Sequence, residues 1–201
     1  MTAEDTHEDD SEGQYIGDIE SAELVTDDRL SLTPEQHEQL KNQLHGNQFK
    51  SLRRANRRYL VIGRGSGPAG DRRLAVCRLL DERPKATAFR LEDFGFTGDD
   101  IDLWAPAFDI LSKMATYVVG VLEDFDGGHV WELGYLYHYQ THVRDTLWLL
   151  KRIYSTTEEM RDHYDNGMAA SHLAALEEAI GEHVITWEDP GDLPDAVKQL
   201  P

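Results

Sequence analysis

Residues 116–122 read Thr-Tyr-Val-Val-Gly-Val-Leu and form the clearest continuous apolar run in the chain. A strand of a parallel sheet has this composition when helices cover both of its faces. Shorter apolar runs of the same kind lie at residues 59–63, 86–91, 146–150 and 183–187. The segments between these runs have apolar residues at the spacing of a helix. This alternation of strands and helices predicts a parallel sheet wrapped by helices.

The number and order of these runs indicate the topology. Five strands with intervening helices are typical of the flavodoxin-like, doubly wound α/β fold, whose strand order is 2-1-3-4-5. In this order the winding reverses between the first and third strands, and open sheets bind ligands at the carboxyl ends of those two strands. We expect such a domain over residues 58–201, with helices at 71–80, 100–114, 131–140, 156–164 and 169–180 and a last helical turn at 194–200.

Two segments precede this domain. Residues 1–28 contain eleven acidic residues and no Lys or Arg, and their apolar residues show no sustained period. Such a segment buries too little surface to offset its ordering entropy, so residues 1–30 are expected to form an acidic disordered tail. Residues 31–57 are expected to form one helix, capped by Thr33, and a linker. The basic residues of this region are Lys50, Arg53, Arg54, Arg57 and Arg58.

The charge balance limits the partners. The chain has 38 Asp and Glu against 20 Lys and Arg, which gives a formal net charge of −18. This charge would repel nucleic-acid backbones and anionic membranes over most of the surface, so neither is an expected partner. The acidity and the excess of Arg over Lys are typical of salt-adapted proteins and indicate a halophilic protein.

Three further features bear on the location in the cell. No stretch approaches the roughly 20 apolar residues that span a bilayer, and the N-terminus lacks the basic and apolar regions of a signal peptide. Cys77 is the single cysteine, so the chain cannot form an internal disulfide or a cysteine metal site. We therefore expect a cytoplasmic protein.

The loop after the first strand is rich in glycine, with four glycines from position 63 to position 70. Backbone N–H groups of such a loop, ahead of a helix N-terminus, can bind phosphate or ribose oxygens. The spacing is neither a Walker A motif nor a dinucleotide fingerprint. Arg72 and Arg73 either add anion contacts or are surface charges. The candidate binding residues of this loop are Gly63, Arg64, Gly65, Ser66 and Gly67.

The loop after the third strand and the helix that follows it carry the more specific signal. Glu132 lies on this helix, which is otherwise apolar, and shares a face there with Gly128 and Tyr135. Facing the crevice, Glu132 could act as nucleophile or electrostatic stabiliser toward a sugar carbon, with Asp126 as acid/base partner. The alternative is structural: Asp126 caps the helix and Glu132 bonds a neighbouring hydroxyl. Further candidate substrate contacts are Asp124, Gly128 and Tyr135.

Residues 126–135, Asp-Gly-Gly-His-Val-Trp-Glu-Leu-Gly-Tyr, resemble the D-x-G-x-x-x-E-L-G-Y/x signature of nucleoside 2-deoxyribosyltransferases and their nucleotide N-glycosidase relatives. The resemblance covers about residues 59–153 and implies the flavodoxin-like fold and a homo-oligomer in which a neighbour helps to close the pocket. It also implies cleavage or transfer at the N-glycosidic bond of a nucleoside or nucleotide. Glu132 would then attack the anomeric carbon, and Asp126 would assist at the base or the sugar.

Two features depart from that family. Thr116 stands where many members carry an Asp that helps to handle the base, and the first loop is longer and richer in glycine. Residues 131–133, Trp-Glu-Leu, also resemble the helix of TIR domains in which a glutamate serves NAD cleavage. Three hypotheses remain: an N-glycosidic transferase or hydrolase, a TIR-like NAD hydrolase, and a non-catalytic nucleotide-binding or interaction domain of the same fold.

Histidines and aromatic residues gather on and near the same helix. His138 and His142 have an i, i+4 spacing that can bind a metal, but no HExxH motif accompanies them. Surface placement or partner contacts are favoured, so we expect no metal site, and we expect no cofactor. The tryptophans are expected in the core or at an oligomer interface, although Tyr135 or Tyr139 could stack on a base.

Overall fold

The computed structural model describes residues 32–45, 47–96, 100–139, 145–165 and 167–201. The chain divides between Gln39 and Leu40 into two units, and the second unit contains the whole sheet. The tail expected over residues 1–30 lies outside the described residues, as do His142 and the side chain of Tyr139.

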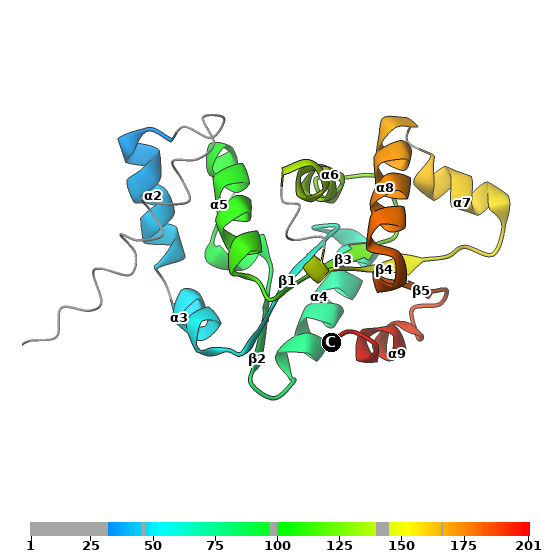
Figure 1. The fold of residues 1–201 in the computed structure, drawn as a ribbon, viewed down its shortest axis with the longest axis horizontal. Coiled ribbons are helices and arrows are strands. Elements are labelled where there is room, and N and C mark those ends of the chain that lie inside the picture. Colours follow the sequence, from blue (N-terminus) through cyan, green and yellow to red (C-terminus); the bar gives the residue numbers. More distant parts are fainter. Residues whose placement is uncertain (1–31, 46, 97–99, 140–144, 166) are drawn as a thin grey trace, which may run out of the picture. The chain divides into compact units, whose positions relative to one another are not determined.

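Five parallel strands form one sheet in the order β2-β1-β3-β4-β5 (Figure 1). This order confirms the predicted flavodoxin-like α/β fold. β1 and β3 are neighbours and stay in register as far as Gly63 opposite Val121. The carboxyl ends of these two strands therefore meet at one edge of the sheet, as predicted. The strands are β1 (Arg57–Gly63), β2 (Ala86–Phe89), β3 (Tyr117–Leu122), β4 (Leu147–Arg152) and β5 (Val184–Trp187).

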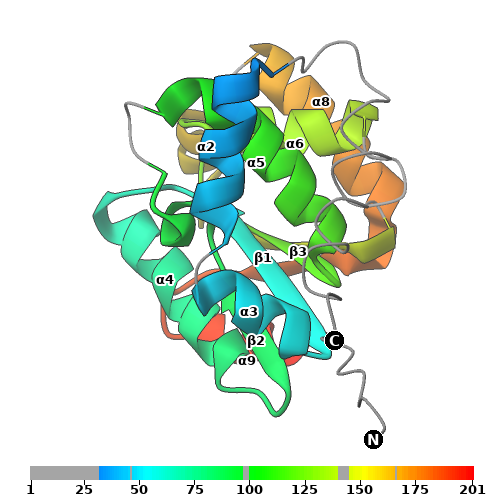
Figure 2. The same cartoon turned by 90° about the vertical axis from the view of Figure 1, so that its left-hand side faces the viewer.

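Helices cover both faces of the sheet. α4 and α9 pack on one face, whereas α5, α6 and α8 lie on the other (Figures 1 and 2). None of the described helices is long and apolar enough to cross a membrane. The helices of the sheet region are α4 (Gly67–Asp81), η1 (Leu91–Phe94), α5 (Ile101–Met114), α6 (His129–Tyr139), α7 (Thr157–Tyr164), α8 (Gly167–Ile180), η4 (Gly181–His183) and α9 (Leu193–Lys198).

The chain before the sheet contains two helices. α2 (Pro34–Leu44) begins where the sequence predicts, because the side chains and backbone N–H groups of Thr33 and Gln36 bond reciprocally at 2.9 and 3.2 Å. The basic linker contains a helix that the sequence did not predict, α3 (Asn47–Arg54). In α3 the side chain of Leu52 is buried, and this apolar burial stabilises a short helix among charged residues.

The helix after β1 begins earlier than predicted. The sequence placed its start at Asp71, whereas α4 begins at Gly67. Pro68 suits the first helical turn because the N–H that proline lacks would have no partner there. Gly70 lets the helix approach the loop, since a Cβ at this position would lie 3.0 Å from the carbonyl carbon of Gly65. The connecting loop is therefore only residues 64–66.

The two central strands form the middle of the core. Residues such as Val61 and Val119 are completely buried, as the apolar runs predict. Gly120 allows close packing of β3, because a Cβ there would lie 2.7 Å from Cδ2 of Leu149. Cys77 of α4 is also buried, and this burial raises the pKa of its thiol to about 12. The thiol is therefore core filling rather than a nucleophile.

Candidate active site

Glu132 lies one turn into α6, at the carboxyl edge of the sheet. The chain turns from β3 into this helix at Gly127, whose φ of +129° is rarely adopted by other residues. The N–H of Glu132 donates to the carbonyl of Gly128 at 3.2 Å, which closes the first helical turn. The glycine pair that the sequence placed before the helix thus positions Glu132 behind the end of β3.

Glu132 lines a cavity of about 690 Å³. Trp104 and Phe108 of α5 and Trp131 of α6 provide aromatic walls, and the rings of Phe108 and Trp131 meet edge to face at 6.3 Å. A cavity of this size and lining suits a small organic ligand. The full lining is Gly63, Gly65, Arg73, Leu91, Glu92, Trp104, Ala105, Phe108, Gly128, His129, Trp131 and Glu132.

The carboxyl of Glu132 is half-buried, and it makes no hydrogen bond or ion pair to any residue that the structure describes. The alternative in which Glu132 bonds a neighbouring hydroxyl therefore has no such contact to support it. Burial raises the pKa of Glu132 to about 7; the charge of Arg73 opposes this rise and that of Glu92 adds to it. Near neutral pH the carboxyl is thus present in both protonation states.

Arg73 and Glu92 form an ion pair in the same cavity. Arg73 of α4 is 4% exposed, and its Nη2 donates to Oε1 of Glu92 on η1. Gly63 makes room for this arginine at the end of β1, since a Cβ there would lie 3.0 Å from Cδ of Arg73 and 2.8 Å from the carbonyl oxygen of Val121. Glu92 is not among the candidate residues that the sequence indicates, and its only signal is its place in an acidic loop after β2.

His129 is, with Arg73, a buried polar residue of the cavity, with 3% of its surface exposed. Its Nε2 lies 2.9 Å from the carbonyl oxygen of Asp124. A carbonyl oxygen only accepts, so Nε2 carries the proton and Nδ1 is an acceptor in the neutral ring. Burial lowers the pKa of His129, which favours this neutral form.

Asp126 lies away from the Glu132 cavity. It lines an adjoining cavity of about 560 Å³, and Trp131 belongs to the walls of both. The side chain of Asp126 is 86% exposed and accepts a hydrogen bond from Nη1 of Arg64 at 2.7 Å. Asp124 also pairs with Arg64, at 3.2 Å, and its carboxylate accepts from the N–H of Asp126. Among the described acids, Glu92 rather than Asp126 shares the lining with Glu132.

Four of the remaining candidate binding residues line one or other of the two cavities. Gly63, Gly65 and Gly128 line the Glu132 cavity, whereas Tyr135 lines the adjoining one and donates to Asp109 at 2.9 Å. Ser66 precedes α4 without a side-chain cap, and Gly67 is the first residue of that helix. In the described part of the chain neither of these two contributes to the lining of either cavity.

The arginines near the first loop all pair with acids. Arg64 pairs with Asp124 and Asp126, Arg73 with Glu92, and Arg72 with Glu123. These contacts place a carboxylate beside each guanidinium that the sequence offered for an anion. The sequence left open whether these arginines contact an anion or are surface charges, and in the structure they form ion pairs.

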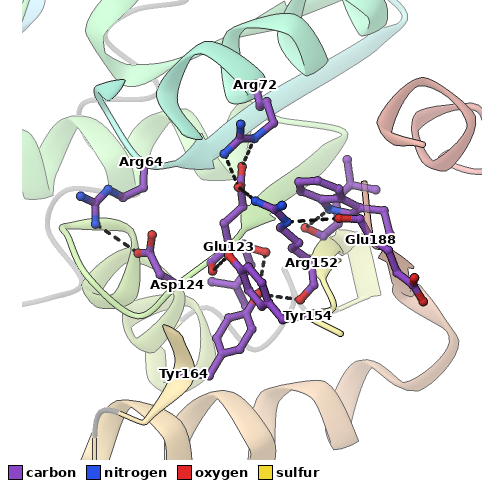
Figure 3. A network of polar contacts seen from close by, with 11 residues as sticks. Arg64, Arg72, Glu123, Asp124, Arg152, Tyr154, Tyr164 and Glu188 are labelled. Carbon is purple, nitrogen blue, oxygen red and sulfur yellow. Dashed lines mark hydrogen bonds and ion pairs between the residues drawn. The ribbon is translucent and has the colours of Figure 1, made fainter. Parts of the chain in front are cut away.

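Glu123 is the centre of a polar network at the ends of β3 and β4 (Figure 3). Its carboxylate is 3% exposed and accepts from Nε of Arg72 at 2.7 Å and from Arg152 at 3.2 Å. The hydroxyl of Tyr154 donates to the carbonyl oxygen of Glu123 at 2.8 Å, and that of Tyr164 donates to the carbonyl oxygen of Arg152 at 2.8 Å. A buried carboxylate with these partners connects the strand ends and holds the rim of the crevice.

Two histidines meet in the adjoining cavity. Nε2 of His138 on α6 lies 3.4 Å from Nε2 of His172 on α8. Within the part of the chain that the structure describes, no group of three His, Cys, Asp or Glu residues is placed to hold a metal ion.

Comparison with known proteins does not extend the resemblance of residues 126–135. No protein-family model, no curated protein and no solved structure matches the chain.

Proposed function

We propose that this protein cleaves or transfers the N-glycosidic bond of a nucleoside or nucleotide, with Glu132 as the nucleophile. The observation that carries the proposal is the half-buried Glu132 carboxyl, without a hydrogen-bonding partner among the described residues, in a cavity with aromatic walls. The cavity lies at the carboxyl ends of β1 and β3, where sheets of this topology bind ligands.

The reaction requires the ionised form of Glu132. Its carboxylate oxygen would form a bond to the anomeric carbon while the carbon–nitrogen bond breaks, and the bonding electrons would leave with the base. Water or a second base would then release the sugar from Glu132. The pKa of about 7 leaves roughly half of the carboxyl ionised at neutral pH, before any ligand binds.

The walls of the cavity suit the base of such a substrate. Trp104, Phe108 and Trp131 offer flat apolar surfaces on which a base can stack. Asp126 remains the proposed partner that assists departure of the base. It lies in the adjoining cavity beyond Trp131, so a base that extends past this tryptophan would come within its reach.

The test is incubation of the pure protein in high salt with separate ribonucleosides, deoxynucleosides, their 5′-phosphates and NAD. Chromatography then measures released base or nicotinamide. We expect release from a nucleoside or nucleotide that Glu132→Gln abolishes and that Glu178→Gln retains, because Glu178 is an exposed residue of α8 outside both cavities. A free second base in the mixture distinguishes transfer from hydrolysis, because only a transferase forms the exchanged nucleoside.

Two other outcomes would contradict the proposal. Release of nicotinamide from NAD alone would identify a TIR-like NAD hydrolase with the same glutamate. No release from any compound, at high protein concentration, would identify a non-catalytic nucleotide-binding or interaction domain.

A further inference from the structure

Two histidines from different helices meet outside the Glu132 cavity. Nε2 of His138 on α6 lies 3.4 Å from Nε2 of His172 on α8, and both residues line the adjoining cavity of about 560 Å³. α6 and α8 pack against each other (Figure 1). The two rings are inclined by 78°, so their faces do not stack. Spacing in the sequence paired His138 with His142, whereas the fold brings it to a histidine 34 residues away.

The separation of the two nitrogen atoms matches a shared metal ion. A metal ion bonds an imidazole nitrogen at about 2.0 Å. Two nitrogens at this distance and 3.4 Å apart subtend an angle of roughly 115° at the ion, between the tetrahedral and the trigonal value. The same separation is longer than an ordinary hydrogen bond. When the ion binds, each ring carries its proton at Nδ1, so that both Nε2 atoms present a lone pair.

Met168 provides a third ligand of a different kind. It precedes His172 by four residues on α8, so the two residues share a face of this helix, and both line the same cavity. Met168 is 76% exposed, although methionine is usually buried in folded proteins. The described chain has no metal-binding group of three His, Cys, Asp or Glu residues, and methionine is not one of these types. The thioether sulfur is a soft metal ligand.

The cavity favours a soft ion with a single charge. Mg²⁺ and Ca²⁺ prefer oxygen ligands, and the one carboxylate among the described lining residues, that of Asp126, already pairs with Arg64. Zinc sites use cysteine, histidine and carboxylate ligands, whereas imidazole together with a thioether suits copper, and the thioether selects Cu(I). The other walls are mainly apolar and include Phe125 and Trp131, so one positive charge is less costly there than two.

We propose that His138, His172 and Met168 bind a Cu(I) ion in the adjoining cavity. The ion would join α6 to α8 through ligands from both helices. Trp131 separates this site from the Glu132 cavity, because it belongs to the walls of both. The copper site does not depend on the proposed function, since none of its three ligands lines the Glu132 cavity.

The test is an anaerobic titration of the full chain with Cu(I), in competition with the coloured Cu(I) chelator bathocuproine disulfonate. We expect the protein to withdraw one Cu(I) per chain from the chelator complex. X-ray absorption of the copper-loaded protein should then show two nitrogens at about 2.0 Å and one sulfur at about 2.3 Å from the metal. Zinc binding to the same protein is measured separately by calorimetry.

Variants assign the ligands. His138→Ala or His172→Ala should weaken Cu(I) binding by at least about 100-fold, because loss of a direct ligand costs at least as much as loss of a residue that orients one. Met168→Leu should weaken Cu(I) binding by at least about tenfold and leave zinc binding unchanged, since thioether sulfur is not a zinc ligand. Met160→Leu is the matched control, because Met160 lines neither cavity and its sulfur accepts from the N–H of Tyr154. His138 and Met168 are exposed, so their replacement leaves the core intact.

Failure of the protein to compete for Cu(I) overturns the inference, as does binding that survives both histidine replacements. Equal Cu(I) affinities of Met168→Leu and the wild-type protein contradict the copper assignment and leave a two-histidine zinc site as the result. Weakening by Met160→Leu as large as that by Met168→Leu also contradicts it. One Cu(I) per chain, lost in the three ligand variants and kept in the control, supports the site whether or not the protein releases a base.

Discussion

Replacement of Glu132 by glutamine is expected to abolish base release and, at the same time, to stabilise the fold at alkaline pH. Burial raises the pKa of this carboxyl from an ordinary value of 4.5 to about 7. Between these values the folded protein keeps a proton that the unfolded chain releases, so the free energy of unfolding falls as the pH rises. At about 1.4 kcal/mol per pH unit, the loss between pH 5 and pH 8 is about 2.5 kcal/mol. Glutamine has a similar shape and no charge, so the free energy of unfolding of the Glu132→Gln protein does not fall in this way as the pH rises.

Urea unfolding of both proteins at pH 5 and pH 8, in the same salt, measures this effect. Other titrating groups are common to the two proteins, so they cancel in the difference between the free energies of unfolding. That difference should increase in favour of Glu132→Gln by about 2.5 kcal/mol from pH 5 to pH 8. Glu178→Gln, at an exposed site, should show no such increase. An equal difference at both pH values would show that the Glu132 carboxyl titrates normally and would remove the argument that its cavity desolvates it.

Three further outcomes are expected. The kcat/KM for base release should rise about tenfold from pH 6 to pH 8 with a midpoint near 7, because only ionised Glu132 attacks; a flat profile would contradict this role. Asp126→Asn should lower the rate of base release by about 100-fold, the usual contribution of a positioned acid/base group, and an unchanged rate would assign Asp126 to its ion pair with Arg64 alone. Gly63→Ala should lower the free energy of unfolding by about 2 kcal/mol, because the added Cβ would lie 2.8 Å from the carbonyl oxygen of Val121 at a φ of +149°; equal urea midpoints would refute this.

The fold could be predicted because its signals are local. Each strand is an apolar run, and the run at residues 116–122 became the buried centre of the sheet, β3. The parallel order follows from connectivity, since each connection between strands contains a helix. The capped start of α2 at Thr33 was also a local signal, because both partners of the cap lie within four residues.

Other local features were not predicted correctly. The start of α4 was placed at Asp71 instead of Gly67, because glycines favour a loop in an isolated sequence. In the folded chain Gly70 is required for close contact with Gly65. Tertiary packing therefore outweighs the local preference of glycine for a loop. The helix α3 was missed for a similar reason, since burial of Leu52 in the folded chain stabilises it among charged residues.

The sequence by itself determined the topology and the position of Glu132 behind the end of β3, because both depend on periodicity and on the order of elements along the chain. Only the tertiary structure decided which groups surround this carboxyl. Arg73 and Glu92 come from different elements and meet in its cavity, whereas Asp126, which precedes α6 in the loop after β3, pairs with Arg64 outside that cavity. Such pairing depends on where the fold places side chains from distant segments and on which of them must neutralise a buried charge. Short-range sequence patterns contain neither kind of information.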